Sequence, residues 1–109
     1  MKYIKKKLFI ERTIIQNIGK KFGTPTYCYS YSKLKEKKEN FKKNFKSFSP
    51  LICFSVKSNT NVNLIREIGK FGLGADVVSK GELMMALKAG VNPSKIVFSG
   101  AVSYTHLRA

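Results

Sequence analysis

Three short apolar segments recur at a constant interval in the second half of the chain. They begin at residues 51, 73 and 95, so each starts 22 residues after the one before. Helical patterns follow the first two, over 61–71 and 79–89, and the segment 51–56 is apolar almost throughout, as in a strand buried on both faces. This alternation predicts parallel strands joined by helices, and hence an α/β sheet or barrel.

The first half of the chain has a less regular pattern. Lys7–Ile10 and Thr26–Ser30 are rich in β-forming residues and are predicted to be strands. Between them, Thr13 and Gln16 match a Thr-x-x-Gln capping box. This box predicts a helix that starts at Thr13 and ends at Gly23, since glycine suits the position after a helix.

The formal net charge of +15 raises the question of nucleic-acid binding. Much of the excess lies in lysine-rich stretches over 2–7 and 33–46. The second stretch is typical of the solvated face of a helix from Ser32 to about Lys46, with three aromatic residues on its apolar side, Phe41, Phe45 and Phe48. A charge excess alone supports only non-specific attraction, and no RNA- or DNA-binding motif is present. We therefore expect no specific nucleic-acid partner.

Membrane insertion, secretion and metal binding have no sequence signal. No apolar run approaches the roughly 18 residues that span a bilayer. The basic start of the chain is not followed by the continuous apolar core of a signal peptide. Cys28 and Cys53 lack the close spacing of zinc ligands. We expect two reduced thiols in a cytoplasmic protein that has no metal site and no membrane partner.

Lys57 is the strongest candidate for a catalytic residue in this sequence. It directly follows the predicted strand 51–56 and precedes a polar loop. In βα barrels this edge, where the strands end, carries the catalytic residues. An amine partly desolvated there is nucleophilic toward an aldehyde. The alternative is a strand-end lysine that reaches into water.

Two acidic residues are expected at the same edge. Asp76 is the only aspartate of the chain and lies near the end of the strand that starts at residue 73. It could hold Lys57 by charge or orient a neighbour, or be a structural carboxylate in a basic protein. Glu82 completes a Ser-x-x-Glu capping box with Ser79, in which its carboxylate accepts from the Ser79 amide. A capping role and an active-site position for Glu82 are compatible.

Four motifs, in order across residues 22–100, resemble those of the fold-type III pyridoxal-phosphate decarboxylases. Phe22–Tyr27 matches their Phe-Gly-Thr-Pro-x-Tyr entry, and Val56–Asn59 resembles their Val-Lys-Ala-Asn motif. Gly74–Leu83 resembles Gly-Ala-Asp-Val-Val-Ser-x-Gly-Glu-Leu, and Asn92–Gly100 contains their Pro-x-Lys-Ile-Val-Phe-Ser-Gly stretch. The combination is most similar to the diaminopimelate decarboxylase branch of the family.

The resemblance implies a cofactor and a role for each matching residue. Lys57 would bind pyridoxal 5'-phosphate as a Schiff base, and Asp76 and Glu82 correspond to acidic catalytic positions near that lysine. The implied reaction is the decarboxylation of meso-2,6-diaminopimelate, a small amino-acid substrate, to L-lysine and carbon dioxide. The full-length enzyme would be a cytoplasmic homodimer.

The resemblance also implies a fold and predicts how much of it this chain contains. The family has a (β/α)8 TIM barrel of the alanine-racemase type, which needs about 200 residues or more. Residues 1–100 are therefore expected to be its N-terminal part, truncated after about three βα units and inactive alone, with the C-terminal β-domain absent. Beyond Gly100 the sequence departs from the family, and 101–109 is expected to be a foreign or read-through tail.

Three alternatives remain open. An ornithine- or arginine-type decarboxylase, or a carboxynorspermidine decarboxylase of polyamine synthesis, would use the same motifs on another substrate. A non-catalytic pyridoxal-phosphate-binding barrel protein would lack the β-domain. A basic nucleic-acid-binding module would show steeply salt-dependent binding that survives Lys57→Ala.

Overall fold

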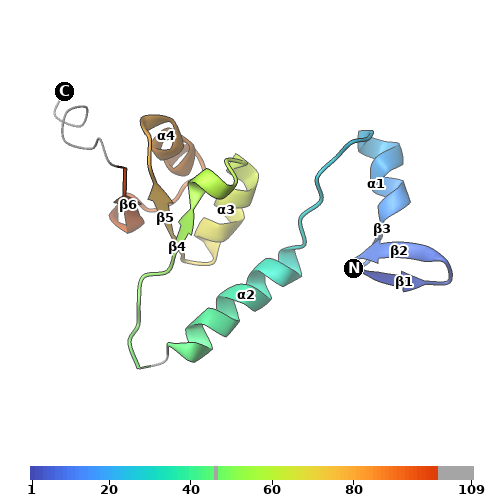
Figure 1. Ribbon diagram of the computed structural model, residues 1–109, viewed down its shortest axis with the longest axis horizontal. Coiled ribbons are helices and arrows are strands. Elements are labelled where there is room, and N and C mark those ends of the chain that lie inside the picture. The colour runs from blue at the N-terminus through green and yellow to red at the C-terminus, as the bar shows by residue number, and fades with distance from the viewer. Residues whose placement is uncertain (46, 101–109) are drawn as a thin grey trace. The chain divides into compact units, whose positions relative to one another are not determined.

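The computed structural model describes residues 1–45 and 47–100 and consists of two compact units, 1–41 and 42–109 (Figure 1). The segment 101–109, predicted to be a foreign tail, lies outside the described residues. Among the helices that the structure describes, none has the length and apolar character needed to cross a membrane.

The first unit begins with a small antiparallel sheet in the order β1-β2-β3. The elements of this first unit are β1 (Lys2–Ile4), β2 (Lys7–Ile10), β3 (Thr13–Ile14), α1 (Ile15–Phe22) and the start of α2 (Tyr31–Asn44). The predicted strand Lys7–Ile10 is confirmed as β2. The predicted strand Thr26–Ser30 is wrong, because no strand of the described chain pairs with it. A segment without a pairing strand cannot form the backbone hydrogen bonds of a sheet.

Helix α1 begins later than the capping box predicts. Thr13 pairs with Ile10 in β3, so its backbone belongs to the sheet. The N-cap position is occupied by Ile14, which makes no side-chain cap hydrogen bond. Gly23 ends the helix as predicted, with a φ of 83° and its amide donating to the Gly19 carbonyl at 2.9 Å.

Helix α2 begins at Tyr31, and its cap is Ser30 rather than the predicted Ser32. Ser30 Oγ accepts from the Lys33 amide at 3.2 Å and donates to Glu11 Oε1 at 2.8 Å. The Ser32 amide donates to the same Glu11 oxygen, also at 2.8 Å. The Ser32 amide and then the Ser30 hydroxyl are the main causes that hold the pKa of Glu11 below its ordinary value.

We expect acid to loosen this end of α2. Because the pKa of Glu11 is lower in the folded than in the unfolded chain, its stabilising contribution is complete above the unfolded pKa. That contribution is lost as the pH falls through the folded pKa. The proton shift of the Ser32 amide, followed by NMR, should titrate with this carboxylate and become pH-independent in Glu11→Gln. A wild-type Ser32 amide shift that ignores pH would contradict the contact.

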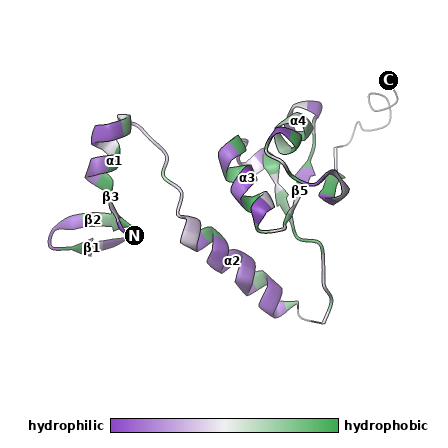
Figure 2. Ribbon diagram, turned by 180° about the vertical axis from the view of Figure 1, so that it is seen from behind, coloured by the Kyte–Doolittle hydropathy of each residue, from purple (hydrophilic) through white to green (hydrophobic). Residues whose placement is uncertain are grey.

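The apolar side predicted for α2 is wrong. Helix α2 is hydrophilic along most of its length (Figure 2), and none of its side chains is buried. Phe41 and Phe45 are 53% and 46% exposed, and Phe48, beyond the helix, is 74% exposed. Lysine and glutamate occupy most positions of the helix, which leaves too narrow an apolar stripe to form a core.

The second unit contains the predicted repeat of strands and helices (Figure 1). Three strands form a parallel sheet in the order β4-β5-β6, which confirms the α/β class. The elements are β4 (Cys53–Ser55), the short 3-10 helix η1 (Val56–Ser58), α3 (Val62–Lys70), β5 (Gly74–Val77), α4 (Lys80–Lys88), a second 3-10 turn η2 (Pro93–Lys95) and β6 (Ile96–Phe98). Each strand is shorter than its predicted segment, and 3-10 turns take up Val56 at the end of the first segment and Lys95 at the start of the third.

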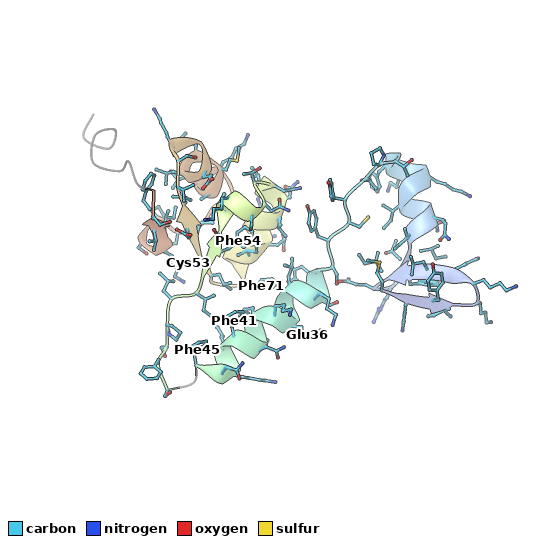
Figure 3. The ribbon with its side chains drawn as sticks, in the orientation of Figure 1. Glu36, Phe41, Phe45, Cys53, Phe54 and Phe71 are labelled. Atoms are coloured by element: carbon cyan, nitrogen blue, oxygen red, sulfur yellow. The ribbon has the colours of Figure 1, made fainter. Side chains whose placement is uncertain are left out.

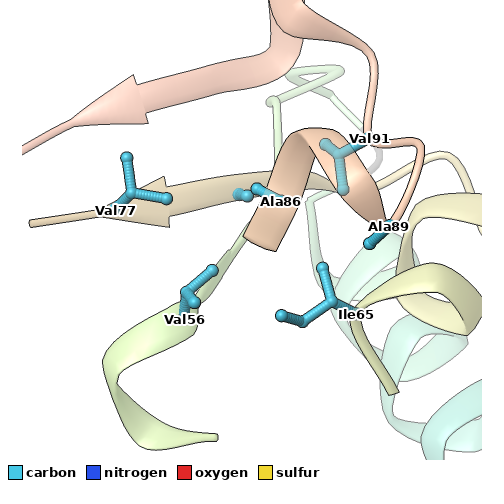
Figure 4. Close-up of a cluster of buried hydrophobic side chains, with 7 residues drawn as sticks. Val56, Ile65, Val77, Ala86, Ala89 and Val91 are labelled. Carbon is cyan, nitrogen blue, oxygen red and sulfur yellow. The ribbon is translucent and has the colours of Figure 1, made fainter. Parts of the chain in front are cut away.

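The core of this unit lies between one face of the sheet and helices α3 and α4. Seven apolar residues are buried together, and Figure 4 labels six of them converging from strands, helices and turns; the full set is Val56, Ile65, Ala75, Val77, Ala86, Ala89 and Val91. Phe54, Ile96 and Phe98 pack against this cluster. This packing fixes the position of η1, because Val56 at its start is fully buried.

Candidate active site

Lys57 lies in η1, in the turn immediately after β4. Both β5 and α4 contact this turn. The Lys57 side chain is exposed, and within residues 1–45 and 47–100 it forms no ion pair. The described residues therefore leave Lys57 open to solvent, and its partial desolvation in the whole protein stays a prediction. Val56 points into the core, whereas the residue that follows extends from the edge of the sheet into solvent.

The sheet has a second face that the core does not use. Cys53 and Phe54, labelled in Figure 3, are successive residues of β4, so their side chains leave opposite faces of the strand. Phe54 packs on the core with Ala75 of β5, its register partner. The opposite face therefore carries the alternate residues Cys53, Ser55, Gly74, Asp76 and Val97.

Asp76 lies on this second face, on β5, which is the central strand of the sheet. It is opposite Ser55 on β4 and opposite Val97 on β6. Its Oδ1 atom accepts a hydrogen bond of 2.5 Å from the Ser99 hydroxyl. Burial first, and then the negative charge of Asp76, raise the pKa of the Cys53 thiol, which places this thiol in the electrostatic field of the carboxylate. Among the described residues Asp76 forms no ion pair with Lys57, and its side chain contacts Ser99; its role in the site stays a prediction.

Glu82 caps helix α4 in a different way from the one predicted. The Ser79 hydroxyl accepts from the Glu82 amide at 3.2 Å, which confirms one half of the capping box. The Glu82 carboxylate, however, accepts from the Val78 amide at 2.8 Å instead of the Ser79 amide. The carboxylate thus reaches one residue further back, to the link between β5 and α4, and lies at the edge where the strands end.

The structure brings the three predicted site residues to one edge of the sheet. Lys57 follows β4, Asp76 lies near the end of β5, and Glu82 lies in the first turn of α4, the helix after β5. Sequence reasoning did not single out Ser99 as a neighbour of Asp76. The signal was available in the alternation of β6, because Val97 and Ser99 are two residues apart and Val97 is the register partner of Asp76.

A cavity of about 440 Å³ in this unit lies at the other edge of the sheet. Its lining residues precede the strands or belong to the end of α2 and the segment after it: Lys42, Phe45, Ser49, Pro50, Leu51, Ile52, Gly72, Leu73 and Lys95. None of the three predicted site residues lines it. The candidate site therefore consists of the end of the sheet at which the strands finish, together with the second face. The described residues do not enclose this site.

Residues 31–108 match the family model described as the pyridoxal binding domain of pyridoxal-dependent decarboxylases. The matched residues extend into the segment predicted to be a foreign tail. Over 100 residues the chain is 43% identical to a diaminopimelate decarboxylase of Aquifex aeolicus, a match that covers 92% of this chain and 23% of that protein. Over 79 residues it is 46% identical to the enzyme of the same name from Helicobacter pylori, covering 72% of this chain and 20% of that protein.

The solved structures that this chain resembles include further diaminopimelate decarboxylases. A diaminopimelate decarboxylase from M. jannaschii superposes with a TM-score of 0.85 at 32% identity, covering 91% of this chain and 24% of that one. The Helicobacter pylori enzyme, solved in complex with L-lysine, superposes with a TM-score of 0.73 at 40% identity, covering 79% and 22%. The chain thus spans about a quarter of the length of the relatives that it matches.

Proposed function

The chain belongs to the pyridoxal-dependent decarboxylase family, because most of it matches the pyridoxal binding domain of that family. We propose that the whole protein decarboxylates meso-diaminopimelate to L-lysine and carbon dioxide. The observation that carries this proposal is the match of almost the whole chain to diaminopimelate decarboxylases in both sequence and structure. The family assignment supports pyridoxal 5'-phosphate as the cofactor.

We propose that β4, β5 and β6 are consecutive strands of a (β/α)8 barrel and that residues 1–100 belong to its N-terminal part. Helices α3 and α4 cover one face of the sheet, as the outer helices of such a barrel do. The second face, with Asp76, would then face the barrel interior. The remaining strands and a C-terminal β-domain would come from sequence beyond this chain, in a homodimer. The two free cysteines fit a cytoplasmic location.

The residues at the strand ends fit the proposed cofactor. The amine of Lys57 is exposed and unpaired within the described chain, so it is accessible to an aldehyde. When bound, pyridoxal phosphate supplies an electron sink for the charge left at the carbon that loses carbon dioxide. Asp76 adds a fixed carboxylate on the adjacent strand. Glu82 ties the start of α4 to Val78 and so holds the rim beside Lys57.

Substrate preference tests the proposed function. The full-length protein, loaded with pyridoxal phosphate, should release carbon dioxide and L-lysine from meso-diaminopimelate with a kcat/KM at least about tenfold above that for ornithine, arginine or carboxynorspermidine. A preference for one of those three would transfer the proposal to polyamine synthesis. Cofactor binding without decarboxylation would favour a non-catalytic barrel. Salt-dependent nucleic-acid binding that survives Lys57→Ala, with no cofactor bound, would favour the basic module.

A further inference from the structure

We propose that Ser99 is a positioning residue, whose hydroxyl holds the Asp76 carboxylate in a single orientation on the second face of the sheet. The inference deepens the proposed function and rests on it for its catalytic consequence. The contact itself is a property of this chain and can be tested without any reaction.

The backbone on both sides of the contact is fixed. The Ser99 amide donates to the Val77 carbonyl at 2.9 Å, which extends the pairing of β6 with β5 beyond the end of the strand. Val97 is the register partner of Asp76, so Ser99, two residues further, lies diagonally across from the carboxylate on the same face. The Ser99 hydroxyl then donates to Asp76 Oδ1 at 2.5 Å.

Gly100 confines the chain immediately after Ser99. A Cβ atom at this position would lie 2.7 Å from the Val78 carbonyl oxygen and 2.6 Å from Cε1 of Phe98. The backbone after β6 therefore passes closer to the end of β5 than a side chain at position 100 would allow. This close approach keeps the Ser99 hydroxyl within reach of Asp76.

A hydroxyl donor has a clear use at this position. An ionised carboxylate is stabilised and oriented by hydrogen bonds that it accepts. Two further polar residues of β4 lie near Asp76 on this face: Ser55, its register partner, and Cys53, whose thiol is a weak donor. Among the described residues, neither of them hydrogen-bonds to the carboxylate, whereas the Ser99 hydroxyl does. Asp76 forms no ion pair within the described chain, so Ser99 supplies the strong donor among these contacts. Without it the carboxylate could rotate away from the edge where Lys57 lies.

The test compares Ser99→Ala, which removes the hydroxyl, with Ser99→Thr, which keeps it, in the full-length protein. The control is Ser94→Ala, because Ser94 lies before β6 and its hydroxyl, within residues 1–45 and 47–100, donates to Asn92 and not to Asp76. Before cofactor is added, the side-chain carboxyl ¹³C resonance of Asp76 is assigned by its disappearance in Asp76→Asn. We expect it to shift in Ser99→Ala and to stay near its wild-type position in Ser99→Thr and Ser94→Ala.

In the loaded enzyme, Ser99→Ala should lower kcat roughly 10- to 100-fold, the effect of losing a hydrogen bond to a charged group, with little change in KM. Ser99→Thr should restore most of this loss. An Asp76 resonance that is identical in wild type and Ser99→Ala would overturn the role of Ser99, even if the wild type decarboxylates. A wild type without decarboxylase activity would overturn the proposed function instead, since the resonance reports on the contact alone.

Discussion

Replacing Lys57 with alanine is expected to lower kcat/KM of the full-length protein by roughly a thousandfold or more. This is the scale of loss when the group that forms the covalent bond is removed from an active site. Lys57 is exposed at the turn after β4, and the packing of Val56 holds that turn against β5 and α4. The rate of carbon dioxide release, with the visible absorption band of the bound cofactor, measures the loss.

Lys88→Ala is the matched control for this change. Lys88 is also an exposed lysine, but it ends α4, at the opposite end of the helix from Glu82. Its removal takes away the same charge from the same unit and should leave the rate within about twofold of wild type, as expected of a surface substitution away from the site. Equal activity of the two variants would show that Lys57 has no special role.

Gly74→Ala should destabilise the protein by about 3 kcal/mol, because it forces extra volume into a packed sheet. A Cβ atom at this position would collide with the Lys95 carbonyl oxygen and lie 2.8 Å from Cys53 Sγ. The backbone cannot withdraw easily, since the Gly74 amide donates to the Ile52 carbonyl at 2.9 Å. Urea unfolding of the variant and wild type measures the difference.

Gly81→Ala serves as the control, because the same methyl group is added where there is room. The nearest atom to a Cβ at position 81 is Ser79 Oγ, 3.9 Å away. Gly81 lies in the first turn of α4, where alanine is the better helix former, so the variant should be neutral or more stable by up to about 1 kcal/mol. Equal losses in the two variants would contradict the close packing at Gly74.

The parallel sheet was predictable because its signals are local. Each strand lies within a mostly apolar segment, and each helix of the repeat carries its own cap. The Asn61 side chain accepts from the amides of Asn63 and Leu64, and the Ser79 hydroxyl accepts from that of Glu82. Such contacts span at most three residues and can be read directly from the sequence.

Two errors in the first unit have different causes. Thr13 was expected to cap a helix but pairs with Ile10, three residues before it, so a tight strand pairing and a capping box compete for the same short segment. The contact of Glu11 with Ser30 spans 19 residues and holds the start of α2. No local pattern predicts this second contact, because it depends on how the chain folds back.

The candidate site divides in the same way. The position of Lys57 after a buried strand was predictable from the apolar run that precedes it. The donor to Asp76 was not, because Ser99 is 23 residues further along the chain and comes beside it only through the register of β6. The capping box correctly predicted that the Glu82 carboxylate lies at the N-terminus of α4. Its hydrogen-bond partner, however, is the Val78 amide and not the predicted Ser79 amide.

The most direct test of Lys57 as the cofactor-binding residue is chemical trapping. The full-length protein is incubated with pyridoxal phosphate, reduced with borohydride, digested, and its peptides are analysed by mass spectrometry. We predict that the reduced cofactor adds its mass to one lysine, Lys57, and that Lys57→Ala carries no such adduct while Lys88→Ala does. A cofactor trapped reproducibly on another lysine, or no adduct on a folded wild-type protein, would contradict the account.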